Sequence, residues 1–171
     1  AVKGTCRAWR RGWKETLKKR ERPRLVVFGG HDSEGGTVNS LERYDPSTNE
    51  WEEEAVAPMP SARSYVGVAV FDGKLYAAGG LVAVDDGEDD EEDAAPSNLV
   101  ERYDFETKAW EAVAPMAVER FAPAVAVLDG KAYAVGGYND NDDDGALNSV
   151  ERYDPVTNAW VAPMATARQG H

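Results

Sequence analysis

The sequence has little of what disulfide-bonded, metal-binding and membrane proteins require. Its 171 residues include one cysteine, Cys6, which excludes an internal disulfide and is typical of a reducing compartment. Two histidines and no second cysteine give no Cys/His cluster, so we predict no metal site and no cofactor. No run of 18 apolar residues occurs, and we expect no membrane-spanning segment. These absences favour a cytoplasmic or nuclear protein.

Sequence motifs of catalysis are missing as well. The chain has no serine in a nucleophile elbow, no HExxH sequence and no phosphate-binding glycine loop. His31 has no second histidine or cysteine near it, which makes it a poor candidate for a general base or a metal ligand. We therefore expect that the chain is not an enzyme.

Charge is distributed unevenly along the chain, whose net charge is −12. Residues 1–24 carry ten Lys and Arg against two Asp and Glu, whereas residues 25–171 carry nine against twenty-nine. An acidic body repels phosphate groups, so we expect no nucleic-acid ligand and a surface that repels its own copies.

Three copies of one pattern follow the basic segment. Each copy runs from Gly-Gly through Tyr-Asp to Trp and then Ala-Pro-Met, and the step from Tyr to Trp is seven residues in all three. The spacing varies between Gly-Gly and Tyr-Asp and between Trp and Pro, so this is a repeat with loops at two joints. The repeated glycines and aromatic residues, which we predict to be structural, are Gly29, Gly30, Tyr44, Trp51, Gly79, Gly80, Tyr103, Trp110, Gly136, Gly137, Tyr153 and Trp160.

Local sequence indicates β-strands throughout the repeats. Residues 65–71 and 122–128 are short apolar runs that end at Asp-Gly, the strongest short signal for a β-hairpin, and a second apolar run follows each. The segments before Tyr-Asp are predicted third strands, and the segments that carry Trp are predicted fourth strands. Pro, Asp and Asn between them supply turn chemistry.

The repeat resembles the Kelch family. The third copy carries Arg120, then Lys-x-Tyr before Gly136-Gly137, Val-Glu-Arg-Tyr-Asp-Pro at 150–155, and Thr-x-x-Trp before Pro163-Met164. The resemblance covers residues from about 24 to the end of the chain. It implies an all-β fold of kelch propeller blades of about 50 residues, each with four strands.

On this basis we expect about three blades of an incomplete propeller. Blade 1 is partial at residues 24–57, blade 2 covers 63–114, blade 3 covers 120–163, and 167–171 begin a further blade. Propellers close with four to eight blades, so we expect the chain to be a fragment with an exposed edge at each end. Two copies would supply six blades, so a homodimer is the predicted association of the isolated fragment.

Residues 1–22 show apolar positions at helical spacing among many basic residues, which predicts a short amphipathic N-terminal α-helix or linker. It either packs on a neighbouring domain or serves as a basic membrane-surface or nucleic-acid helix. Residues 5–11, with Cys6 and Trp9, resemble the last helix of an F-box. The lead into Pro23 also resembles the linker between BACK and Kelch domains in BTB–Kelch adaptors. Both resemblances imply a role in ubiquitin ligases.

Two of the predicted loops are strongly acidic. Residues 85–93 hold eight Asp and Glu, and we expect the loop over 82–96 to be mobile and dispensable, or else to attract a basic partner. Residues 140–145 with Glu151 match the EF-hand pattern letter by letter. We reject an EF-hand because strands rather than helices are predicted around it, and because Glu42 and Glu101 fill the same repeat position. A weak calcium site on the aspartates remains an alternative.

The Kelch resemblance also implies a ligand face. In Kelch adaptors it is formed by the loops between second and third strands and by the Arg and its successor before each first strand. Arginine binds acidic groups through paired hydrogen bonds, although the acidic loops oppose that preference, and a structural brace between blades is the alternative for each Arg. The predicted partner-binding residues are Arg63, Ser64, Arg120, Phe121, Arg168, Gln169, His31, Asp32, Tyr138 and Asn139.

The predicted function is therefore a Kelch-repeat module that binds a protein or peptide, as the substrate-recognition part of a ubiquitin-ligase adaptor. Ubiquitin-ligase subunits are the further predicted partners. Two alternatives stay open at this point. One is a kelch-fold enzyme that acts on a carbohydrate or alcohol, as galactose oxidase does, although its metal ligands have no visible match here. The other is a purely structural scaffold.

Overall fold

The computed structural model describes residues 25–31, 33, 36–52, 57–84, 93–139 and 145–165. The helix predicted over residues 1–22 and the predicted partner-binding residues Asp32, Arg168 and Gln169 lie outside this part of the chain. The described residues form strands, turns and connections, and none of them belongs to a helix of the length and apolarity needed to cross a membrane.

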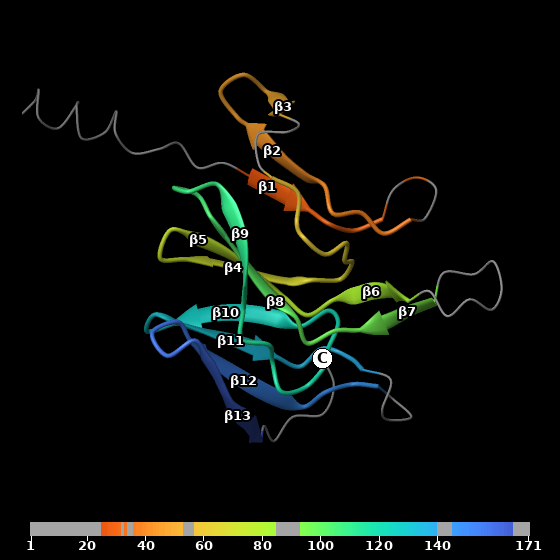
Figure 1. Ribbon diagram of the computed structural model, residues 1–171, viewed down its shortest axis with the longest axis vertical. Coiled ribbons are helices and arrows are strands. Elements are labelled where there is room, and N and C mark those ends of the chain that lie inside the picture. The colour runs from red at the N-terminus through yellow and green to blue at the C-terminus, as the bar shows by residue number, and fades with distance from the viewer. Residues whose placement is uncertain are drawn as a thin grey trace, which may run out of the picture.

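Three antiparallel sheets follow one another along the chain, and each is one blade (Figure 1). In order across the sheets, the strands are β1 (Leu25–Phe28), β2 (Leu41–Asp45) and β3 (Glu50–Glu52) in blade 1; β4 (Gly67–Phe71), β5 (Lys74–Ala78), β8 (Val100–Asp104) and β9 (Ala109–Val113) in blade 2; and β10 (Ala124–Leu128), β11 (Lys131–Val135), β12 (Ser149–Asp154) and β13 (Ala159–Ala165) in blade 3. The all-β fold of kelch blades is confirmed. Among the described residues, the sheet of blade 1 has three strands and lacks the first strand that blades 2 and 3 have.

The first hairpin of each complete blade turns at Asp-Gly. Asp72 and Gly73 have φ of 50° and 67°, and Asp129 and Gly130 have φ of 50° and 69°. Two successive positive φ angles are those of a type I′ turn, whose twist matches the flanking strands. The Asp-Gly signal in the sequence therefore sets the register of β4 on β5 and of β10 on β11.

The turn between third and fourth strands is held by the Asp of Tyr-Asp. In blade 2, Asp104 Oδ1 accepts hydrogen bonds from the backbone N–H groups of Glu106 (2.8 Å) and Thr107 (3.1 Å). Its carboxylate also pairs with Lys74. The hydrogen bond from Lys74 and these two N–H groups lower the pKa of Asp104 to about 2. The turn ends at Lys108 with φ of 57°, where the other blades have asparagine.

Blades pack through small residues on the first strand of one blade and larger residues on the next. A Cβ atom on Gly67 of β4 would lie 2.7 Å from side-chain atoms of Pro123 and Val125 in blade 3, so only glycine fits there. Each Trp adds a polar contact: Trp110 Nε1 donates to Ala57 O and Trp160 Nε1 to Ala114 O, both at 2.8 Å. The ring of Trp110 packs on Tyr103 of its own blade and on Phe28 of blade 1, so both the ring and the N–H of this residue join neighbouring blades.

The double glycines join each blade to the lead-in segment of the next. Gly30 N–H donates to Arg63 O at 3.1 Å, and Gly80 N–H donates to Arg120 O at 2.9 Å. A Cβ atom on Gly79 would lie 2.3 Å from Arg120 O, and Gly79 has φ of 67°. The backbone approaches this closely because glycine has no side chain and tolerates positive φ.

The structure corrects one prediction about the acidic loop. We predicted a mobile loop over residues 82–96, but β6 (Leu81–Val84) and β7 (Asp93–Pro96) form a two-stranded hairpin that extends from blade 2 (Figure 1). Residues 85–92, which carry most of the charge, lie outside the described part. The ends are ordered because Leu81 exchanges backbone hydrogen bonds with Ser64 and the Leu-Val-Ala-Val segment is free of charge.

Candidate partner-binding face

The connections between second and third strands lie on one side of the three blades, with the segments that lead into β4 and β10 (Figure 1). Backbone bridges tie the two sets together: Ser64 pairs with Leu81 in blade 2, and Phe121 pairs with Tyr138 in blade 3. The Asp-Gly turns and the turns after Tyr-Asp lie at the other ends of the strands. We call the first side the loop face.

Arg63 is fully buried and joins three strands of blade 2. Its Nη1 donates to Gly79 O at 2.7 Å and to Leu99 O at 3.0 Å, and its Nη2 donates to Glu101 Oε2 at 2.7 Å. Burial lowers the pKa of Arg63, and the carboxylate of Glu101 opposes that shift. The charge of Arg63 is thus neutralised inside the blade.

Arg120 makes the same contacts in blade 3. Its Nη1 donates to Gly136 O at 2.8 Å, and its Nη2 donates to Glu151 Oε1 at 2.7 Å, with both side chains fully buried. Glu151 also accepts hydrogen bonds from the backbone N–H groups of Ala117 (2.7 Å) and Val118 (3.1 Å). Because Glu151 is used in this brace, the structure supports our rejection of an EF-hand.

The burial of these residues corrects part of the predicted partner-binding set. Arg63, Ser64, Arg120 and Asn139 are buried, so direct contact of their side chains with a partner does not fit the structure. The brace that we kept as the alternative for each Arg is the role that their geometry supports. It is a brace within one blade rather than between blades. Partner contact stays a prediction for the more exposed residues.

Those exposed residues form a row of aromatic rings across the three blades. Ring centroids are 6.0 Å apart for His31 and Tyr65, 6.2 Å for Tyr65 and Phe121, and 5.6 Å for Phe121 and Tyr138. Tyr65 is 57% exposed and Tyr138 is 38% exposed. We call these four residues the aromatic row. The structure brings together three residues that the sequence predicted separately.

Tyr65 is the member of the row that the sequence analysis missed. It follows Arg63 by two residues and has φ of 52°, which is uncommon for a bulky side chain. Ala122 holds the same repeat position with φ of 50°, and its N–H donates to Tyr65 O at 2.8 Å. The positive φ thus belongs to the repeat, and the exposure of its ring is what makes Tyr65 a candidate for partner contact. The signal in the sequence was a large aromatic where the other blade has alanine.

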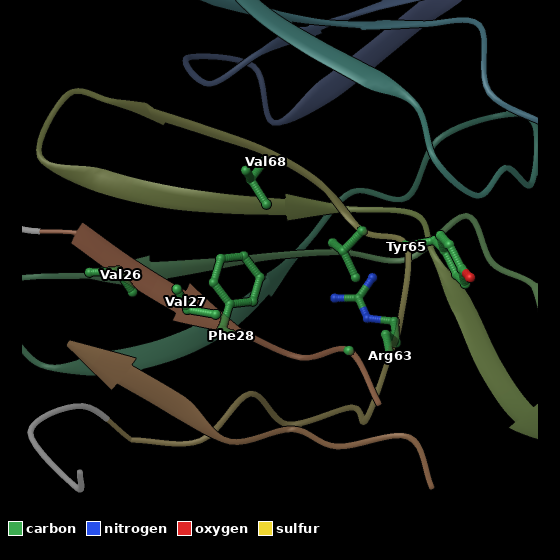
Figure 2. A pocket seen from close by; sticks show the side chains of 8 residues that line it. Val26, Val27, Phe28, Arg63, Tyr65 and Val68 are labelled. Carbon is green, nitrogen blue, oxygen red and sulfur yellow. The ribbon is translucent and has the colours of Figure 1, made fainter. Parts of the chain in front are cut away.

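A groove of about 330 Å³ lies beside the row, between blades 1 and 2 (Figure 2). Its walls come from β1 and from the segment around β4, and Tyr65 lies at one end. In blade 2 the equivalent place is filled, because Gly67 of β4 packs on Pro123 and Val125. The groove therefore lies where the first strand of blade 1 would lie, and we do not interpret it as a small-molecule site. Its lining residues are Val26, Val27, Phe28, Gly30, Arg63, Tyr65, Val66 and Val68.

The described residues hold no group of three or more His, Cys, Asp or Glu side chains that could bind a metal ion. All the aspartates of residues 140–144 lie outside the described part, so the alternative of a weak calcium site there stays a prediction.

Comparison with known proteins identifies the repeats. A family profile described as the KLHDC2/KLHL20/DRC7 Kelch-repeats domain matches residues 2–170. The chain belongs to the Kelch-repeat family. Kelch-like protein 33 of Homo sapiens is 37% identical over 118 residues, which are 66% of this chain and 19% of that protein. Kelch repeat and BTB domain-containing protein 12 of Danio rerio is 35% identical over 116 residues, 66% of this chain and 18% of that protein.

This Kelch chain thus spans about a fifth of the length of the curated relatives that it matches. Among solved structures, that of YjhT superposes with a TM-score of 0.65 at 19% sequence identity, covering 87% of this chain and 51% of YjhT. The likeness to YjhT shows the fold alone, and it agrees with the sheets described above.

Proposed function

We propose that this Kelch-repeat chain is a protein-interaction module, the substrate-recognition part of a larger ubiquitin-ligase adaptor. The observation that carries the proposal is the aromatic row, an exposed set of rings held on a rigid β scaffold. Recognition is commonly grafted onto rigid folds in this way, through side chains and loops at one face. The BTB domain named in one relative supports the ligase part, because that part needs a second domain that recruits the ligase.

We also propose that the chain is not an enzyme and acts in the cytoplasm or nucleus. The buried arginine and glutamate pairs are used as braces, so these charged groups are not available to act on a substrate. The aromatic row itself offers stacking surfaces rather than nucleophiles. These features support recognition rather than turnover.

The test is affinity capture from a cell extract with the full-length protein, followed by mass spectrometry. We expect a partner protein together with ligase adaptor and scaffold subunits. Tyr65→Asn in the row should lose the partner and keep the ligase subunits. Val156→Ser, at a 92% exposed residue in a turn of blade 3 away from the row, is the matched control and should lose neither.

Two other outcomes separate the parts of the proposal. Capture of the partner without ligase subunits would leave the interaction role and remove the ligase role. Capture of no protein, together with turnover of a sugar or alcohol, would overturn both and favour a kelch-fold enzyme.

A further inference from the structure

Acidic residues of the sequence are concentrated in the connections between second and third strands, which begin and end at the loop face. In the sequence, the three connections between second and third strands, residues 31–40, 81–99 and 138–148, contain fourteen Asp and Glu and no Lys or Arg. The turns at the other ends of the strands contain three acids and one lysine over residues 46–49, 72–73, 105–108, 129–130 and 155–158. The charge that the sequence places in these connections therefore favours a cationic over an anionic ligand at the ends of the strands that they join.

The arginines that would attract an acidic ligand are not exposed at this face. Arg63 and Arg120 are fully buried, and each donates to a carboxylate at 2.7 Å. A ligand at the surface meets neither guanidinium, and the charge of each is already compensated. Among the described residues, the two arginines on which the family resemblance based an acidic partner are therefore not available to one.

The aromatic row supplies the contact that a cation needs. A guanidinium group stacks on an aromatic ring because the ring face is negative, and stacking is stronger for Arg than for a strongly hydrated Lys ammonium. Tyr65 is the most exposed ring of the row, and Tyr138 follows it. Neighbouring ring centroids are 5.6–6.2 Å apart, so the four rings contact one another in a continuous row, and Tyr65 and Tyr138 are members of it that are exposed to a guanidinium.

We propose that the aromatic row binds an arginine-containing, cationic segment of a partner protein, with Arg side chains stacked on Tyr65 and its neighbours. This inference rests on the proposed interaction function and names its ligand class. The acidic connections attract the segment over a distance, and the rings select Arg over Lys at contact. The groove beside the row is not required for binding.

Fluorescence anisotropy on the 171-residue chain at 0.15 M salt tests the proposal. Three labelled nine-residue Gly/Ser peptides serve as probes, each with three Arg, three Lys or three Glu at the same positions. We expect the Arg peptide to bind most tightly, the Lys peptide at least threefold more weakly, and the Glu peptide not at all. Tyr65→Phe keeps the ring and should bind the Arg peptide as the unchanged chain does.

Tyr65→Asn removes the ring and should weaken binding of the Arg peptide at least tenfold. Asparagine tolerates the positive φ of residue 65, so this variant should keep the fold, and an unchanged circular dichroism spectrum confirms that. Equal binding of the Arg and Lys peptides, or no effect of Tyr65→Asn, would overturn the proposal in favour of unspecific charge attraction.

Tighter binding of the Glu peptide, or no binding of any peptide, would overturn the proposal as well. Neither result would contradict the interaction function itself. If the capture experiment still found a partner that is lost in Tyr65→Asn, that partner would bind through an uncharged or acidic segment. The two experiments therefore fail independently.

Discussion

At the residue scale, one arginine in each complete blade has the largest structural role. Arg63 and Arg120 each join three strands, through two backbone carbonyls and one carboxylate. Such a pair stabilises the fold only as a unit, because either charge alone would be buried without compensation. Each pair holds the segment that leads into the first strand of its blade, and Tyr65 and Phe121 of the aromatic row lie on these segments.

Arg120→Met should lower the free energy of unfolding by about 3–5 kcal/mol, because Glu151 would keep a buried charge without a counterion. Urea denaturation followed by tryptophan fluorescence measures it. The double variant Arg120→Met with Glu151→Leu should recover much of the loss, although Ala117 and Val118 would still lack an acceptor. The half-exposed pair of Arg102 and Glu111 is the control, and Arg102→Met should change stability by less than about 1 kcal/mol.

Lys108→Asn should raise the free energy of unfolding by about 1 kcal/mol. Lys108 has φ of 57°, which asparagine tolerates better than lysine. At the same repeat position, Asn158 Oδ1 accepts a hydrogen bond from Tyr153 OH at 2.8 Å, a contact that lysine does not make. Urea denaturation again gives the value. Lys108→Ala should give no gain, and equal stabilisation by Ala would contradict this explanation.

At the scale of strands and loops, some connections between strands are the same in every complete blade and others differ. The Asp-Gly turns keep the same φ angles in blades 2 and 3, whereas the connections between second and third strands differ in length and structure. The β6–β7 hairpin shows where such a connection becomes part of the scaffold, since Leu81 bonds to the Ser64 backbone that precedes β4.

Replacing residues 85–92 with a two-residue Asn-Gly turn should leave the thermal midpoint within a few degrees, because β6 and β7 stay paired. Differential scanning calorimetry measures the midpoint. A deletion that extends through Leu81 and Pro96 should lower it further, since the backbone bonds between Leu81 and Ser64 are then lost. If the shorter replacement abolished folding, the charged tip would have to belong to the scaffold.

At the scale of the whole molecule, the described blades form an arc with apolar residues exposed on blade 1. Val27 is 48% exposed, while Ala77 and Ala134 at the same repeat position are fully buried. Val68 of β4 is 46% exposed on the wall of the groove between blades 1 and 2. Apolar surface of this kind favours association, with a neighbouring blade or with another copy.

We expect the isolated 171-residue chain to associate, with a dimer of six blades as the predicted form. Light scattering should give a mass above 18.6 kDa, and Leu25→Lys with Val27→Lys should shift it toward the monomer by adding charge to the exposed face. Val156→Lys, in a turn that is already exposed, is the control and should not change the mass. A stable monomer of the unaltered chain with a cooperative melt would contradict the prediction.

The sequence by itself determined the blades, because their signals are local. Asp-Gly requires positive φ at two adjacent residues, the Asp of Tyr-Asp specifies a turn, and the fixed step from Tyr to Trp repeats the third and fourth strands in all three copies. These features depend on a few consecutive residues, so they could be predicted without knowing what lies nearby in space. The paired ends of the acidic loop were the exception, since β6 bonds to β7 and, through Leu81, to Ser64 of another segment.

Only the tertiary structure decided the roles of the candidate site residues. Whether Arg63 faces a ligand or braces a blade depends on Glu101, 38 residues further along the chain. The aromatic row likewise joins rings from three blades, and no local pattern shows that Tyr65 lies between His31 and Phe121. Side-chain direction and burial follow from packing between distant segments, which spacing along the sequence does not encode.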